Sequence, residues 1–183
     1  MTSLLFTPLQ LGPLAAPNRI AVAPMCQYSA IDGVPQPWHR QHLGALAVSG
    51  AGVVIAEATG VAPEGRITHG CTGLWHDGQE RAWAELVRDM KAVGPGLVGI
   101  QLAHAGRKAS MSEPWKGVKP ADKAKGWVSV GPSAVAFDEG WQIPKALDEA
   151  GMGELDAGQR RPGLLHEADD AGECLLMRIG VEA

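Results

Sequence analysis

The sequence predicts an α/β protein in which parallel strands alternate with helices. Three short apolar runs, residues 20–23, 53–58 and 97–104, have the length and composition of buried strands. Two longer segments between them, residues 38–47 and 79–93, place apolar side chains at helical spacing. The order strand, helix, strand, helix, strand is typical of a parallel sheet or barrel.

The first strand is followed at once by reactive side chains. A stretch with Gly and Pro among apolar residues at 9–18 predicts a small hairpin before it. Pro24 ends the strand, and a thiol, Cys26, and the only tyrosine of the chain, Tyr28, come directly after. An apolar run that stops in this way indicates a barrel strand whose C-terminal end carries function. We therefore consider the C-terminal end of this strand the first candidate for a ligand site.

Both helices have recognisable ends. The first begins near Pro37 and stops at residues 49–52, where glycines cap it. The second stops at residues 94–96, whose Gly-Pro-Gly sequence cannot continue a helix and is not a phosphate loop. A loop rich in Gly and Pro, residues 59–78, precedes the second helix. These signals fix the boundaries of two βα units.

The third strand also ends in polar side chains, and a long excursion follows it. The polar residues are Gln101, His104, Arg107 and Lys108. Residues 109–143 then form an irregular stretch with three tryptophans. Irregular segments of this length are usually functional lids or subdomains. His104, Arg107 and Lys108 are interpreted either as a polar rim at this mouth or as a solvated basic loop.

The last part of the chain lacks a clear pattern. Residues 147–155 resemble the start of a helix, but the Gly and Pro at 156–162 break it. Residues 167–182 have helix-favouring letters and a short apolar patch, without clear continuation. No fourth strand ending in reactive polar residues is evident. We therefore divide the chain into a domain at residues 1–155 and a tail at 156–183 with no assignable domain.

Composition excludes several classes of function. The length of 183 residues and the 45% hydrophobic content predict one ordinary globular domain. The net charge of -4 predicts neither a nucleic-acid nor a membrane partner. Its three cysteines are widely spaced and odd in number, which offers neither a disulfide framework nor a metal site and favours a cytoplasmic setting. The N-terminus has no secretory pattern, and no stretch is apolar enough to span a bilayer.

Two histidines lie three residues apart, as metal ligands can. His39 and His42 fall on the first predicted helix without an accompanying carboxylate or third ligand. We therefore interpret them as packing residues and predict no metal site.

The chain contains three long motifs, residues 18–28 (ending APMCQY), 57–67 (EATGVAPEGRI) and 99–108 (GIQLAHAGRK), with GPSA at 131–134 further on. In this order they resemble the Old Yellow Enzyme family of FMN-dependent oxidoreductases. The spacing of cysteine and tyrosine is similar to that of the bacterial, thermophilic-like ene-reductases, which include the xenobiotic reductases. The resemblance covers roughly residues 3–155. It implies the N-terminal portion of an FMN-binding TIM (β/α)8 barrel, with about three βα units plus the capping excursion.

The resemblance also implies roles for individual residues. Ala23, Pro24, Met25 and Cys26 would lie along the isoalloxazine ring, and Ala58 and Gln101 would also contact the flavin. Cys26 would tune the flavin through a weak hydrogen bond and would not act as a nucleophile. Tyr28 would contact the substrate above the ring. Ala58 would be small because the ring passes close to the backbone, and the Gln101 amide can both donate and accept.

Taken without the motifs, the same residues have simpler interpretations. A single cysteine at a strand end is more often buried and inert, and Tyr28 alone suits a packing role as well. An isolated glutamine at a strand end is usually solvated. The functional interpretation of Cys26, Tyr28 and Gln101 therefore depends on the flanking motifs.

The sequence also departs from the family's pattern. The family continues with a fourth strand bearing a His-x-x-His or His-x-x-Asn pair that orients the substrate oxygen, and here His166 stands alone. The later arginine beside the flavin and the glycine-rich phosphate loops are missing. A complete barrel takes about 250 residues. We therefore expect a truncated barrel followed by unrelated sequence from an early stop or a frame change.

Three functions remain open. The first is an NADPH dehydrogenase or ene-reductase, in which NADPH or NADH reduces FMN and hydride passes to the β-carbon of an activated alkene. The second is a non-catalytic fragment that misfolds or associates as a homo-oligomer or with a complementary half-barrel. The third is another flavin barrel, such as a dihydroorotate-type dehydrogenase, which the APMCQY motif disfavours.

Overall fold

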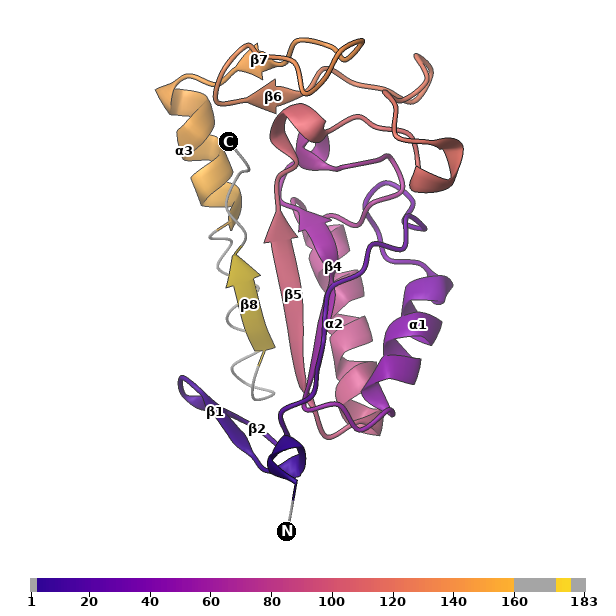
Figure 1. The fold of residues 1–183 in the computed structure, drawn as a ribbon, viewed down its shortest axis with the longest axis vertical. Coiled ribbons are helices and arrows are strands. Elements are labelled where there is room, and N and C mark those ends of the chain that lie inside the picture. The colour runs from indigo at the N-terminus through magenta and orange to yellow at the C-terminus, as the bar shows by residue number, and fades with distance from the viewer. Residues whose placement is uncertain (1–2, 160–173, 179–183) are drawn as a thin grey trace.

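The structure, a computed structural model, describes residues 3–159 and 174–178. Its centre is a sheet in the order β3-β4-β5-β8, in which each neighbouring pair is parallel (Figure 1). The strands are β3 (Ala21–Val22), β4 (Val53–Gly60), β5 (Leu97–Ala103) and β8 (Cys174–Arg178). The predicted alternation of parallel strands with helices is therefore confirmed.

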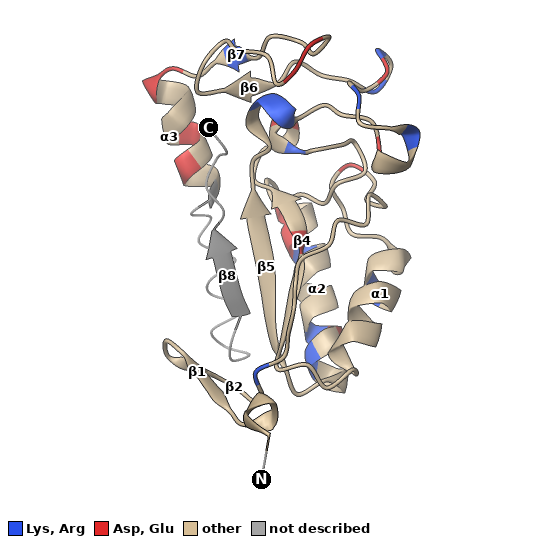
Figure 2. Ribbon diagram, viewed as in Figure 1, with Lys and Arg blue, Asp and Glu red and all other residues tan. Residues whose placement is uncertain are grey.

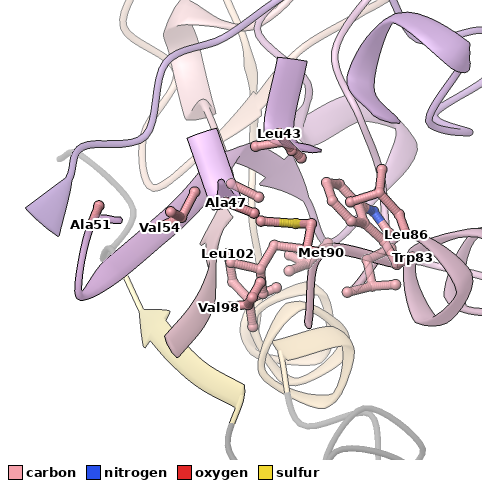
Figure 3. Packing of buried hydrophobic residues seen from close by; sticks show 13 residues of the cluster. Leu43, Ala47, Ala51, Val54, Trp83, Leu86, Met90, Val98 and Leu102 are labelled. Atoms are coloured by element: carbon pink, nitrogen blue, oxygen red, sulfur yellow. The ribbon is translucent and has the colours of Figure 1, made fainter. Parts of the chain in front are cut away.

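Two helices cover one face of this sheet and enclose the main core. They are α1 (Pro37–Ala47) and α2 (Asp77–Val93), which lie side by side on the same side of β4 and β5 (Figure 1). Alternate residues of the strands meet Trp83, Leu86 and Met90 of α2 (Figure 3). Full burial of each large apolar side chain contributes roughly 1.5–3 kcal/mol. This face therefore provides most of the hydrophobic stabilisation.

The ends of α2 explain its position. At its start, the His76 ring accepts hydrogen bonds from the backbone of Gly78 and Gln79, and the Gln79 side chain accepts one from the backbone of His76. At its end, a Cβ on Gly94 would lie 2.2 Å from the carbonyl oxygen of Ala47. Only glycine lets the two helices approach this closely.

A hairpin covers the other face at the N-terminal ends of the strands. It consists of β1 (Leu9–Leu11) and β2 (Leu14–Ala16), which pair antiparallel around a turn where Gly12 has φ of 59° (Figure 1). Leucines of the hairpin pack against Val53, Ile55 and Leu97. The hairpin expected at residues 9–18 is therefore confirmed.

The long excursion lies over the C-terminal ends of the strands (Figure 1). Its short elements are η4 (Pro114–Lys116) and β6 (Val130–Gly131). The elements η3 (Gly106–Lys108) and β7 (Lys145–Ala146) flank it, while η1 (Leu4–Phe6) and η2 (Pro63–Gly65) belong to earlier loops. The indole of Trp127 donates to the carbonyl of Glu64 at 2.8 Å. The guanidinium of Arg66 lies between the rings of Trp75 and Trp127, 5.2 and 5.0 Å from their centroids. These contacts hold the excursion against the loop after β4.

The C-terminal part differs from the sequence-based expectation in two places. Helix α3 (Glu149–Gln159) continues past Asp156, because a glycine inside a helix costs only about 1 kcal/mol and does not always end it. Residues 174–178 form β8, where the composition suggested a helix, and its pairing satisfies the edge of β5 that would otherwise be open. Residues 160–173 and 179–183 of the predicted tail, with His166, lie outside the described residues.

Candidate active site

The predicted flavin residues come together at the C-terminal edge of β3, β4 and β5. Ala58 and Gln101 are Cα partners in neighbouring strands, and residues 23–26 continue directly from β3. Ala58 is the only residue of β4 that is not fully buried, and in β5 only Gln101 and Ala103 are accessible. Met25 is 49% exposed. Small and polar groups are thus accessible along one edge of otherwise buried strands, an arrangement that fits a flat ring.

A β-bulge in β4 creates this arrangement. Ile55 and Ala56 pair in register with Gly99 and Ile100, but the next pair joins Ala58 to Gln101, so Glu57 is an extra residue. Without the bulge, the alternation of the strand would turn Ala58 toward the helices, with Val54 and Ala56. The bulge therefore brings Ala58 onto the face of Gln101 and frees Glu57 to turn elsewhere.

Glu57 turns toward the start of α1 and the segment after Cys26. Its side chain is buried, with one carboxylate oxygen 3.2 Å from Nε2 of His39 and the other accepting the backbone N–H of Gln27 at 3.1 Å. It is the only charged residue of β4, seen as the red segment of that strand in Figure 2. Glu57 has no role of its own among the residues predicted from the sequence. A single carboxylate in an otherwise apolar strand nevertheless indicates a functional or structural task, because an isolated buried charge is costly.

His39 packs in the interior as predicted, and it also contacts Glu57. Its Nδ1 accepts the backbone N–H of Gln36 at 2.9 Å as part of the cap of α1. His42 stacks on Trp38, with ring centroids 6.3 Å apart. In the part of the chain that the structure describes, no three His, Cys, Asp or Glu side chains are grouped as metal ligands would be.

The thiol of Cys26 lies beside a second thiol, that of Cys71, in the loop between β4 and α2. A hydrogen bond with Cys71 and burial raise the pKa of Cys26 well above its usual range, and the negative charge of Glu57 adds to this. Cys71 is the sulfur that a thiolate would favour, because the same hydrogen bond and the backbone N–H of Thr68, 3.3 Å away, lower its pKa. Cys26 therefore stays a neutral thiol at pH 7. A neutral thiol suits the predicted tuning role and not a nucleophile.

Tyr28 lies under the excursion in an unusual backbone conformation. Its φ is 52°, in the left-handed region that side chains other than glycine rarely adopt. Its ring meets Trp115 of η4 edge to face, with centroids 5.8 Å apart. Burial, followed by the neighbouring Cys26, raises the pKa of Tyr28 to about 12. The phenol is therefore protonated at neutral pH and able to donate a hydrogen bond.

Of the basic residues after β5, His104 is fully buried, whereas Arg107 and Lys108 are only partly buried. His104 is buried, accepts the backbone N–H of Gly106 at 3.1 Å through Nδ1, and leaves Nε2 without a partner. Arg107 is partly buried and its Nε has no partner either. The ammonium of Lys108 lies 5.7 Å from the ring centroid of Phe137. Two buried donor or acceptor atoms without partners thus remain just above the strand ends.

Comparison with solved structures defines the class of the fold. The structure of morphinone reductase in complex with tetrahydroNAD matches with a TM-score of 0.74 at 30% identity, over 97% of this chain and 49% of that chain. The fold is thus the N-terminal portion of an oxidoreductase TIM barrel, as the sequence predicted.

The family follows from the sequence match. Residues 4–152 match the NADH:flavin oxidoreductase / NADH oxidase family, and the chain belongs to it. An NADH:flavin oxidoreductase of Gibberella zeae is 41% identical over 155 residues, which cover 82% of this chain and 37% of the relative. An NADPH dehydrogenase of Geobacillus thermodenitrificans is 38% identical over 152 residues, covering 82% and 40%. The chain therefore spans about two fifths of the length of these curated relatives.

These matches confirm several predictions at the level of the family. The resemblance to the Old Yellow Enzyme family is confirmed, and the names of the family and its relatives agree with the predicted oxidoreductase class and with a cofactor set of FMN and NADPH or NADH. The flavin and substrate contacts of the individual residues stay predictions. Among the described residues, no helix has the length and apolar character that crossing a bilayer requires.

Proposed function

We propose that this chain forms the side of an FMN site that carries the isoalloxazine ring, in an NAD(P)H oxidoreductase of the ene-reductase type. The observation that supports this most strongly is that Ala58 and Gln101 are accessible in two otherwise buried strands, where a bulge makes them partners. Residues 23–26, which follow the neighbouring strand β3, extend the same edge. When bound, FMN would supply hydride transfer from NADPH or NADH to the β-carbon of an activated alkene.

The residues of the chain have distinct tasks in this proposal. Ala58 leaves room for the ring beside the backbone, and the Gln101 amide donates to and accepts from the pyrimidine edge. The neutral thiol of Cys26 would turn its single S–H from Cys71 to the bound flavin, where a weak hydrogen bond tunes the cofactor. Tyr28 is a protonated phenol that contacts the substrate above the ring. The excursion with Trp115 covers this side and limits access of water.

Titration of the purified chain with FMN tests the proposal. We expect a shifted flavin absorption spectrum and quenched fluorescence on binding. Gln101→Leu should weaken binding at least about fivefold, because each lost hydrogen bond costs about 1 kcal/mol. Gln41→Leu is the matched control, since Gln41 is exposed on α1 away from the strand ends. Equal affinity of both variants and the parent chain would contradict the assignment of Gln101.

A second candidate, flavin binding without turnover, has its own support. The chain spans about two fifths of its relatives, and its sequence contains no histidine pair after the third strand to orient a substrate oxygen. Consumption of NADPH with an enone or maleimide separates the two candidates. Turnover by the chain alone would exclude the second, whereas binding without NADPH consumption supports it and calls for a homo-oligomer or a complementary half-barrel as partner.

A further inference from the structure

We propose that Glu57, supported by His39, is the residue that positions the segment Cys26–Tyr28 at the flavin edge. This inference rests on the proposed function, because it assigns a task within the same site. Glu57 is a buried carboxylate that has no other role in the proposed site.

Both oxygens of Glu57 have a polar neighbour in the interior, but only one of them accepts a hydrogen bond. One oxygen accepts the backbone N–H of Gln27 at 3.1 Å, one residue after Cys26 and one before Tyr28. The other lies 3.2 Å from His39 Nε2, and the exposed fractions of the His39 and Glu57 side chains are 1% and 3%. Because the hydrogen bond reaches the middle of the segment, it fixes the direction in which both flanking side chains point.

The cap of α1 determines which ring nitrogen of His39 carries the proton. Nδ1 accepts the backbone N–H of Gln36, so the proton of the neutral ring lies on Nε2, toward Glu57. The Nε2–H is not aligned well enough for a hydrogen bond, so the contact with Glu57 is mainly electrostatic. His39 thus supports Glu57 from the side of α1.

The same turn of α1 holds the segment from a second direction. The indole of Trp38 donates to Oε1 of Gln27 at 3.0 Å, and Nε2 of Gln27 donates to the carbonyl of Met25 at 2.8 Å. The segment is therefore held by a side chain from β4 and another from α1. Such support is needed, because Tyr28 has a positive φ that the surrounding contacts must maintain.

The energetic cost of Glu57 also argues for a positioning task. An ionised carboxylate in the interior is unfavourable unless its partners compensate for the lost water. Its neighbours in β4, such as Ile55 and Ala56, show that apolar residues fit this strand. A carboxylate at the bulge gives the segment a strong acceptor that no apolar residue provides.

The test compares Glu57→Gln with Glu57→Leu in the whole chain. Glutamine keeps an acceptor for Gln27 but removes the charge, whereas leucine removes both. The first readout is the rate at which iodoacetamide alkylates Cys26 in the FMN-free protein, resolved from Cys71 and Cys174 by peptide mapping. The second is the affinity for FMN. Glu85→Gln is the control, since Glu85 is exposed on α2.

We expect the alkylation rate of Cys26 to rise in the order parent, Glu57→Gln, Glu57→Leu, with the leucine variant at least about threefold faster. The charge loss favours the thiolate in both variants, and the lost acceptor frees the segment only in the second. FMN affinity should be kept by glutamine and lost by leucine. A purely structural carboxylate would lower the urea midpoint of both variants without this order.

Two outcomes separate failure of this inference from failure of the proposed function. Equal Cys26 alkylation in all four proteins would overturn the positioning role, whatever the affinity for FMN. Absence of FMN binding by the parent chain would overturn the proposed function, while the labelling order would still decide the role of Glu57. If leucine unfolds the chain, Glu57→Ala takes its place, because alanine also removes the acceptor for Gln27: a Cys26 alkylation rate equal to that of Glu57→Gln overturns the inference.

Discussion

The helix-facing side of β4 and β5 differs from the C-terminal ends of the same strands. On the face toward α1 and α2, β4 and β5 alternate regularly, and Val54, Ala56, Val98, Ile100 and Leu102 enter one apolar core. At their C-terminal ends the regularity stops: β4 has a bulge, Tyr28 has a positive φ, and His104 and Arg107 have buried atoms without partners. Stability is therefore concentrated on the helix face, whereas the strand ends give up local stability for a particular arrangement of polar groups.

The largest effect should come from the helix face. Trp83→Ala on α2 removes a side chain that is 2% exposed and whose indole donates to the carbonyl of Gly73 at 3.2 Å. We expect the free energy of unfolding to fall by about 3–5 kcal/mol, through lost burial, a cavity and an unpaired carbonyl. Urea denaturation followed by circular dichroism measures this loss.

The control is on the same helix. Val93→Ala removes a side chain that is 55% exposed, so its effect should stay within about 0.5 kcal/mol. A loss below about 1 kcal/mol for Trp83→Ala would contradict the conclusion that this face holds the fold together.

The helix face is the part that the sequence predicts well. Apolar residues at strand and helix periods mark β4, β5, α1 and α2, because in a closely packed core the side chain that faces inward must be apolar. The observed bounds differ from the expected ones by one or two residues, as with α2, which begins at Asp77 and not at Gln79. Local composition is sufficient there because the contacts repeat along each element.

The strand ends are predicted less well, for a physical reason. A bulge depends on the pairing of two strands that are distant in sequence, so Ala58 and Glu57 could not be assigned to their faces from alternation. The long motifs, and not periodicity, indicated Ala58 and Gln101. The contact of Cys26 with Cys71 likewise joins segments far apart in the chain, and no local pattern indicates it. For β8, composition favoured a helix, while the open edge of β5 favours a strand.

A smaller effect, the pH dependence of stability, should distinguish the strand ends from the helix face. Burial lowers the pKa of His104 below its ordinary value of 6.5, so the folded state keeps the ring neutral while the unfolded state binds a proton. Stability should therefore fall as the pH decreases through 6.5 toward the folded pKa. In His104→Asn this part of the loss should be absent, because asparagine does not titrate. The Asn carbonyl can still accept the hydrogen bond from Gly106, so the local contact is kept.

Urea denaturation at pH 8 to 5 measures this difference. Between pH 7 and 8 the stabilities of the parent and the variant should run parallel, because the ring is neutral in both states. Below pH 6.5 the parent should lose more stability than His104→Asn. Parallel curves over the whole range would mean that His104 does not titrate differently in the folded protein, and the strand ends would then resemble the helix face.

The smallest effect concerns the ionisation of the Tyr28 phenol at the strand ends, which can be measured directly. Tyr28 is the only tyrosine, so tyrosinate absorbance at 295 nm reports on it alone. Burial raises its pKa to about 12, so the folded chain should ionise near pH 12 and the unfolded chain near 10. Stability should accordingly fall between these values, because only the unfolded state releases the proton there. Rapid mixing to alkaline pH, read before unfolding, gives the folded midpoint, and urea-unfolded chain is the control. A folded midpoint near 10 would mean that Tyr28 is solvated and that the excursion with Trp115 does not cover the strand ends.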